Sequence, residues 1–420
     1  MLQKLKQKSL PEYVILLMLV AFFATSALVE LFGIPLTFQL VLDAGWCCLS
    51  VMLLINWKNL LKASVQVKII LVAVAVFFLS TLVGLILNYQ SILYYLWGIR
   101  NNFSFFIFFF ACVLFLKAED LDGYMRGLDI LFVLNFLITL YQFFVLGYEQ
   151  DFLGGIFGTE PGCNKNTNVF MMIVVTNSII RYLNQKETAW RCLLLCGMSL
   201  VVAALAELKM FILEFGAIIV LAVLLTKFSR RKIFLLIGGC IGALIAIQVL
   251  VYIFPLWEGW FSLKEIWETL TDESGYNSGG VEVNRLTAIP IAWNTYLTTW
   301  PQKLFGLGLG HCDYTQISFL ITPFYVQYGH ILYTWFHSGF LMLETGLVGV
   351  VLYGSIFAVI FFTTYSIQRK NKDRLEYCQL AEILTLMCAA LFIYNDSLRS
   401  YAAYLMFFVL ALPFVKVRKS

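Results

Sequence analysis

Charged residues are scarce in this sequence. Only 13% of its 420 residues are Asp, Glu, Lys or Arg, whereas 61% are hydrophobic. A soluble protein carries about 25% charged residues. Apolar runs of roughly 20 residues, the length that crosses a bilayer core, recur along the whole chain. We therefore predict an all-α polytopic membrane protein rather than a soluble domain.

Sequence signatures of several common chemistries are missing. The ten cysteines include no Cys-x-x-Cys pair, so neither a zinc ribbon nor a disulfide scaffold is indicated. No Walker motif is present, which argues against ATP hydrolysis. The chain has three histidines, His311, His330 and His337, and their spacing matches no metal-ligand pattern. The sequence therefore predicts no metal site and no cofactor, and nothing in it indicates nucleic-acid binding.

The apolar runs predict about twelve transmembrane helices, near residues 13–32, 37–55, 68–88, 91–116, 126–147, 167–183, 191–208, 210–226, 233–254, 338–366, 379–394 and 399–415. They divide the chain into three parts. Residues 1–254 hold helices one to nine, and residues 337–420 hold helices ten to twelve. Between them, residues 255–336 form one long loop, in which we expect short amphipathic helices.

The basic residues predict the orientation of the chain. With the N-terminus in the cytoplasm, 22 of the 29 Lys and Arg residues fall in cytoplasmic segments. Both termini are then cytoplasmic, and loop 255–336 is extracytoplasmic. A charge within the bilayer costs at least ~2.5–3.5 kcal/mol, so the other cations are expected to have a partner or a task. These cations are Arg100, Lys165, Lys209, Lys264, Arg285, Lys303 and Arg399.

Arg285 lies at the start of a predicted amphipathic helix in the long loop. Asn284 is a candidate N-cap of this helix, and Pro301 is expected to end it. The guanidinium group is planar and can bind a phosphate through two parallel hydrogen bonds. The alternative is an ordinary ion pair with Glu282.

His337 opens the tenth predicted helix, and Glu344 follows seven residues later on the same helical face. A neutral imidazole at the outer end of a helix can accept a proton from a sugar hydroxyl, because its pKa lies near ambient pH. The alternative is a capping or interfacial histidine. Glu344 needs a partner inside the membrane, for which His337 and Arg399 are candidates.

Other polar positions give weaker signals. Lys209 follows Glu207 at a predicted hairpin, and Arg100 begins a polar Arg-Asn-Asn run within an apolar stretch. Asp396 and Arg399 are expected to form an ion pair. The glycines of FGLGLGH, Gly306, Gly308 and Gly310, are interpreted as a flexible turn. A disulfide between Cys163 and Cys312, the two cysteines in predicted outer loops, is left open.

The segments NRLTAIPIAWN, FGLGLGH and FHSGFLMLETGLVG occur in this order in residues 282–350. In this order the chain resembles the superfamily of O-antigen ligases and O-antigen polymerases, bacterial membrane glycosyltransferases that include capsular and exopolysaccharide polymerases. The loop GTEPGCNKNTNVF, with Asn164 and Asn166, is similar to the family's Asn-rich helix entry. The chain departs from the family at Lys209, where an Arg is frequent, and at Ser338, where an Asn is frequent.

The resemblance implies a reaction and a location. A glycan would move from a polyprenyl-diphosphate lipid to an acceptor hydroxyl, on another glycan or a lipid, at the outer face of a bacterial cytoplasmic membrane. Arg285, Lys209 and Arg100 would hold the diphosphate, and His337, oriented by Glu344, would be the base. His330, Asn164 and Asn166 would contact substrate. Side-chain cations would neutralise the leaving group, so no metal is required.

Three functions remain open at this point. We favour a polymerase of surface polysaccharide repeat units, because the sequence contains no distinct acceptor domain. The alternative within the same class is a ligase that moves the glycan to a lipid, a protein or a wall polymer. The alternative from a different class is a flippase or other transporter of lipid-linked oligosaccharides. Transporters usually contain internal repeats, and none is detected here.

Overall fold

The computed structural model describes residues 8–32, 34, 40–227, 229–255, 259, 262–271, 283–315, 317–370 and 374–416. All regular elements within these ranges are helical. Six of the described helices are long and apolar enough to cross a membrane. The chain is therefore a multi-pass helical membrane protein that requires a bilayer environment.

Each of the twelve predicted helices has a counterpart in the described residues, with ends that differ by a few positions. The six helices that satisfy the length and hydropathy requirements for a span are α5, α6, α7 with the turn before it, α11, α16 and α17. The twelve are α2 (Leu10–Phe32), α3 (Leu40–Ile55), α5 (Val65–Leu87), α6 (Ile92–Phe115), α7 (Leu121–Phe144), α8 (Asn164–Leu183), α9 (Ala189–Leu205), α10 (Lys209–Leu225), α11 (Arg230–Ile253), α16 (His337–Lys370), α17 (Leu375–Tyr394) and α18 (Ala402–Ala411).

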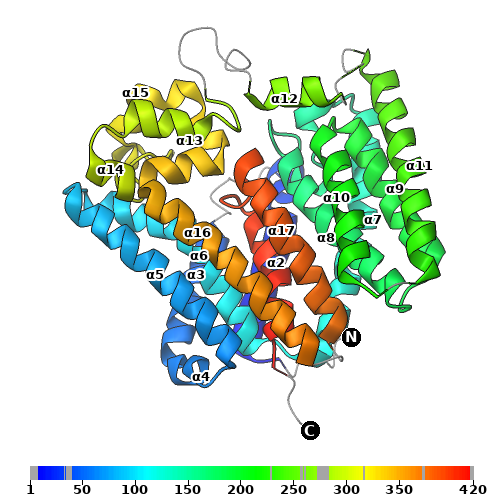
Figure 1. The fold of residues 1–420 in the computed structure, drawn as a ribbon, viewed down its shortest axis with the longest axis horizontal. Coiled ribbons are helices and arrows are strands. Elements are labelled where there is room, and N and C mark those ends of the chain that lie inside the picture. Colours follow the sequence, from blue (N-terminus) through cyan, green and yellow to red (C-terminus); the bar gives the residue numbers. More distant parts are fainter. Residues whose placement is uncertain are drawn as a thin grey trace.

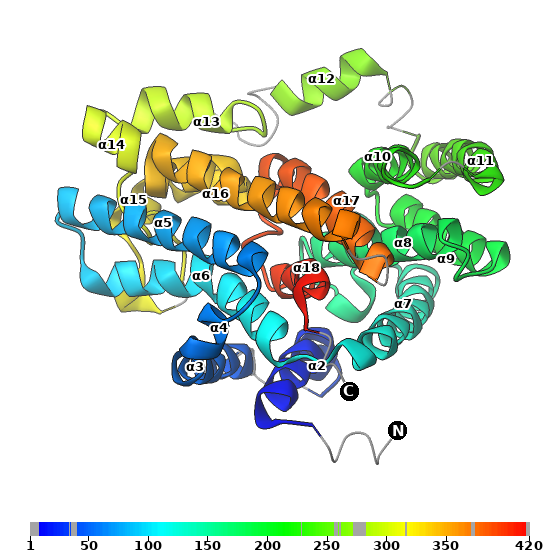
Figure 2. The same ribbon diagram turned by 60° about the horizontal axis from the view of Figure 1, so that its bottom comes forward.

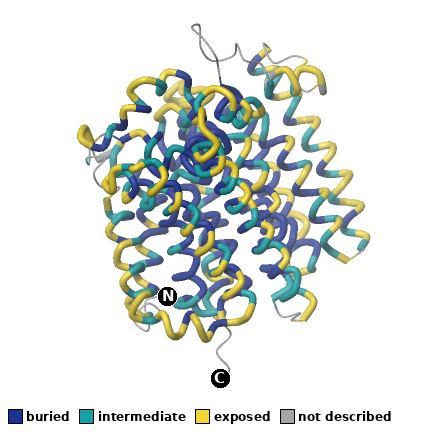
Figure 3. Tube along the Cα trace, turned by 60° about the vertical axis from the view of Figure 1, so that its left-hand side comes forward, coloured by how far each residue is buried: buried dark blue, intermediate teal, exposed yellow. Residues whose placement is uncertain are grey.

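The helices pack around α18. Every residue of α18 is buried, and the helix contacts α2, α6, α8 and α17 (Figure 2). Helices α5 and α11 lie at the periphery and leave large apolar side chains exposed, among them Val72 and Ile241. Figure 3 shows the same division between a buried interior and an exposed outer surface. In a membrane protein such exposed apolar side chains face the lipid.

The two ends of the bundle differ. The two ends of the described part of the chain, called the termini below, lie at the lower end in Figure 1, together with the short helix α4 (Trp57–Leu61). Four short helices between α11 and α16 lie at the upper end (Figure 1). They are α12 (Leu263–Thr271), α13 (Ala288–Ile291), α14 (Trp300–Phe305) and α15 (Pro323–Tyr328). The described parts of segment 255–336 thus carry short helices at the end of the bundle opposite the termini.

The amphipathic helix predicted from Asn284 to Pro301 has a different structure. Helix α13 begins after Thr287 and continues as a π-helical turn to Tyr296, and the chain then becomes extended. Pro301 does not end a helix but lies in the first turn of α14, behind the N-cap Thr299. Proline fits there because the first helical N–H groups have no intrahelical acceptor. The predicted N-cap and helix end were therefore wrong.

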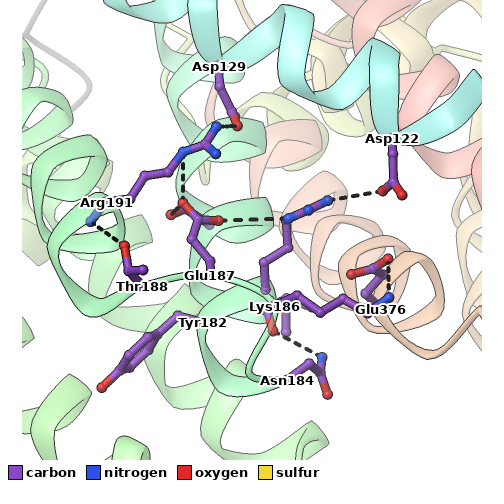
Figure 4. A network of polar contacts seen from close by, with 12 residues as sticks. Asp122, Asp129, Tyr182, Asn184, Lys186, Glu187, Thr188, Arg191 and Glu376 are labelled. Carbon is purple, nitrogen blue, oxygen red and sulfur yellow. Dashed lines mark hydrogen bonds and ion pairs between the residues drawn. The ribbon is translucent and has the colours of Figure 1, made fainter.

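Ion pairs join α7, α9, α17 and the connection between α8 and α9 near the end of the bundle that holds the termini. Arg191 at the start of α9 contacts Asp129 of α7 at 2.6 Å and Glu187 at 3.2 Å. Lys186, in the connection from α8 to α9, contacts Glu376 of α17 at 2.8 Å. Figure 4 shows these side chains converging from the different elements. The cations that determine the predicted orientation are therefore also used to join helices.

Candidate functional site

A polar cavity of about 560 Å³ lies at the end of the bundle opposite the termini. Its wall combines the end of α2, the first turns of α3 and α8, the second to fourth turns of α6, and the connection between α17 and α18. Residues 313–314 and 334–335 of the long connection complete the wall. Pockets that bind small molecules typically enclose roughly 300–1,000 Å³, so this cavity is large enough for a ligand.

Arg100 lines this cavity from the third turn of α6. Its Nε and Nη2 atoms each donate to one carboxylate oxygen of Asp43 in α3, both at 2.8 Å. Its Nη1 atom donates to Asn101 at 2.7 Å, and Nη2 is 3.4 Å from the hydroxyl of Tyr401. A bidentate pair of this kind uses the planar donor edge of the guanidinium. A diphosphate would have to displace Asp43, so these contacts do not favour the predicted phosphate-binding role of Arg100.

Two more ion pairs surround the cavity. Lys165 at the start of α8 contacts both oxygens of Asp396, at 2.7 and 2.9 Å. Arg399 contacts Asp313 at 3.0 Å, and the Asp313 carboxylate also accepts from Asn101. The predicted pair between Asp396 and Arg399 was therefore wrong. Both residues are paired, but with residues 231 and 86 positions away in the chain, which the sequence pattern does not reveal.

Arg285 and Lys209 form a separate cationic cluster. Lys209, the first residue of α10, is paired with Glu207 at 2.9 Å. Arg285 is close enough for its charge to act on the Lys209 ammonium. The Arg285 guanidinium lies 4.5 Å from the ring centre of Tyr394 at the end of α17. Of the three cations predicted to bind phosphate, Arg285 and Lys209 thus lie within range of one another's charge, whereas Arg100 lines the cavity.

His337 lies next to the residues that contact Arg285. Its backbone N–H donates to the carbonyl of Asn395 at 3.3 Å, one residue after Tyr394. The imidazole is only 1% exposed and lies between the rings of Tyr353 and Phe392, at 5.0 and 5.1 Å. Neither ring nitrogen has a hydrogen-bond partner among the described residues. His337 is therefore close to the cation cluster but does not line the cavity in this conformation.

Glu344 does not hold His337. One of its carboxylate oxygens accepts from the backbone N–H of Cys312 at 3.1 Å. The backbone of the same α16 turn accepts from Leu307 and Gly308, at 2.8 and 3.0 Å. The predicted orientation of His337 by Glu344 is thus not what the structure shows. The carboxylate instead fixes the glycine-rich turn that carries Asp313 into the cavity wall.

The glycine-rich turn is tightly packed and was wrongly predicted to be flexible. Gly306, Gly308 and Gly310 all have positive φ angles, a conformation that side-chain-bearing residues rarely adopt. A Cβ atom at Gly98 of α6 would lie 2.5 Å from the Gly310 nitrogen. Helix α16 bends at Gly346, where φ is 63°. Glycine is needed in this region so that three backbone segments can approach closely.

The structure places the other predicted site residues apart. Asn166 lines the cavity. Asn164 instead donates to Asp151 at 2.9 Å and so ties the start of α8 to the loop that precedes it. His330 is exposed on the segment after α15, and His311 faces the ring of Tyr94. Burial lowers the pKa of His311 below its ordinary value. Both cysteines considered for a disulfide, Cys163 and Cys312, are buried and free.

No model of a known protein family matches this chain. No curated protein matches it. The interpretation of the site therefore depends on its geometry and on the motifs of the sequence.

Sequence reasoning missed two of the three aspartates that hold the cations of the cavity, Asp43 and Asp313, and assigned the third, Asp396, to the wrong cation. Asp43, Asp313 and Asp396 each hold one of its cations, and Trp97 and Trp335 contribute to its wall. Asp43 could have been singled out, because it is a carboxylate in the apolar run LVLDAGW. The aromatic residues could not, since the chain contains 10 Trp and 21 Tyr residues without any local pattern that separates these from the rest.

Proposed function

We propose that this protein is a glycosyltransferase of the extracytoplasmic membrane face. It transfers a glycan from a polyprenyl diphosphate to an acceptor hydroxyl and polymerises surface polysaccharide repeat units. In this proposal all twelve helices predicted from the sequence cross a bacterial cytoplasmic membrane, and both termini are cytoplasmic. The observation that carries the proposal is the position of Arg285, which lies against the rings of Phe336 and Tyr394 beside His337 and next to a polar cavity.

The cation cluster suits the leaving group of this reaction. A glycosyl transfer from a lipid diphosphate releases an anionic diphosphate, and preorganised cations that stabilise this charge lower the barrier without a metal. Arg285 offers the fork that binds a phosphate through two hydrogen bonds, and Lys209 adds a point charge. Both lie at the end of the bundle where the short helices of segment 255–336 gather.

His337 is the base in this proposal. A buried polar group without a hydrogen-bond partner costs about 1–3 kcal/mol, so an imidazole with two unpartnered nitrogens is expected to be kept for a task. A base must come within about 2.6–3.2 Å of the proton that it removes. In this conformation His337 is buried against the rings of Phe392 and Tyr353. Catalysis therefore requires the packing around the imidazole to open when substrate binds.

The test is a transfer assay with purified protein. The protein is incubated with a polyprenyl-diphosphate oligosaccharide, and the products are separated by length on a gel. A ladder of products is expected from the wild type, and Arg285→Ala and His337→Ala should abolish it while remaining in the membrane. Lys303→Ala is the matched control, because Lys303 is another cation of the same segment and packs on Trp293 and Trp300.

The outcomes separate the candidate functions. A single addition to a lipid, protein or wall acceptor, without a ladder, would indicate a ligase. Movement of the intact lipid-linked oligosaccharide across a vesicle membrane, without transfer, would contradict the proposal in favour of a transporter. Full activity of both the Arg285 and the His337 variants would remove these residues from the mechanism.

A further inference from the structure

The polar cavity differs in charge from the Arg285–Lys209 cluster. Each of its three cations is already paired with a carboxylate. Two further carboxylates remain, so the lining carries more negative than positive charge. The lining cations are Arg100, Lys165 and Arg399, and the lining carboxylates are those of Glu30, Asp43, Glu160, Asp313 and Asp396. A diphosphate would meet net repulsion here, so the cavity suits a different part of the substrate.

The two remaining carboxylates are accessible to a ligand. Glu160 is exposed, and its carboxylate has no ion-pair or hydrogen-bond partner among the described residues. Glu30 is also exposed, and it accepts from the backbone N–H of Thr159 at 2.6 Å, which leaves its second oxygen available. An ionised carboxylate only accepts hydrogen bonds. The ligand must therefore donate them, as hydroxyl groups do.

Aromatic side chains complete the lining. Trp335 and Tyr314 line the cavity while remaining 49% and 50% exposed. The face of an aromatic ring carries negative charge density and attracts the weakly positive C–H groups of a ligand. A saccharide offers both kinds of surface, since its hydroxyl groups donate hydrogen bonds and its ring C–H groups pack on aromatic faces. A fatty acyl chain would leave the carboxylates without donors.

We propose that this cavity binds an uncharged, hydroxyl-rich saccharide, the acceptor end of the glycan, an inference that rests on the proposed transferase function. The connection between α17 and α18 separates the cavity from the cation cluster. Tyr394 on one side contacts Arg285, and Asp396 on the other side lines the cavity. His337 is bonded to Asn395 between them. Donor phosphates, base and acceptor sugar would then all lie around this one connection.

The test measures saccharide binding separately from transfer. Full-length protein in lipid nanodiscs is applied to an array that carries neutral, amino-sugar and uronic-acid oligosaccharides. We expect binding to neutral oligosaccharides and little binding to uronic acids. Trp335→Ala should weaken this binding about tenfold, the loss expected for one stacked ring. Trp57→Ala is the matched control, because Trp57 is similarly exposed, at 53%, on α4.

A second pair of variants tests the carboxylate. Glu160→Gln should weaken binding of neutral oligosaccharides, whereas Glu149→Gln, an exposed glutamate of the same loop outside the cavity lining, should not. Preferential binding of uronic acids, no binding at all, or unchanged binding by Trp335→Ala would overturn the proposal. If product ladders still formed in that case, the transferase function would stand. Binding of neutral saccharides without transfer would overturn the acceptor role.

Discussion

The ion pair between Asp313 and Arg399 allows a quantitative prediction. Both side chains are largely buried, at 7% and 9% exposure, and they join the glycine-rich turn to the connection between α17 and α18. Removal of one partner of a buried pair typically costs about 3–5 kcal/mol, because it leaves an uncompensated charge. Glu344 also lies close enough to act on Arg399. We therefore expect Asp313→Asn to cost about 3 kcal/mol, at the lower end of this range.

Thermal unfolding of nanodisc-embedded protein, followed by intrinsic fluorescence, measures this loss. One kcal/mol shifts Tm by roughly 2–4 °C in domains of 150–250 residues and by less in longer chains, so several degrees are expected. The variants Asp313→Asn, Arg399→Met and their combination form a double-mutant cycle. The double variant should be more stable than Asp313→Asn alone, because it no longer contains the unpaired cation. A coupling energy of about 1–3 kcal/mol is expected.

An additive cycle would refute this reasoning. If Arg399→Met lowered Tm by the same amount in the wild type and in Asp313→Asn, the two charges would not stabilise one another. The contact between them would then contribute no more than an exposed ion pair, whose worth is about 0–1 kcal/mol.

Three further predictions follow from individual positions. Gly346→Ala should lower Tm, because its Cβ would lie 2.5 Å from backbone atoms of Leu304. Gly354→Ala, on the open face of the same helix, should be neutral or slightly stabilising. Thermal unfolding scans of both variants would compare their Tm values. Arg285→Lys should retain charge but lose the bidentate fork, so transfer should fall at least tenfold, and unchanged rates would contradict phosphate binding by this fork. Burial lowers the pKa of His311, so the unfolded chain binds more protons near pH 6.5 than the folded protein does. Stability should therefore fall as the pH drops below about 6.5. His311→Gln should flatten this dependence when Tm is measured against pH.

The positions of the helices could be read from the sequence because their signal is local. Each apolar run of sufficient length forms its own backbone hydrogen bonds, whatever its neighbours are. The end of the helix predicted at Pro301 was wrong for a local reason too. Proline is favoured in the first turn of a helix as well as beyond its end, and the cap Thr299 decides between the two.

The pairing of side chains could not be read in the same way. Lys165 and Arg399 were correctly expected to need partners, since an unpaired charge at membrane depth is costly. Their partners Asp396 and Asp313 follow from how α8, α17 and the glycine-rich turn meet, which depends on tertiary packing. Glu344 illustrates the same limit. Its helical spacing from His337 was correct, but its carboxylate bonds to the backbone of Cys312 instead.

The central position of α18 has a consequence for assembly in the membrane. This helix follows all the other long helices along the chain, yet its side chains are buried on every side. Helices α2, α6, α8 and α17 are synthesised before the helix that fills the space between them. Until α18 inserts, they must enclose lipid or remain apart, so the cavity wall around residues 396–401 closes only after α18 has been made. A stop codon shortly before residue 402 should therefore expose the nascent protein to degradation rather than leave a smaller folded protein.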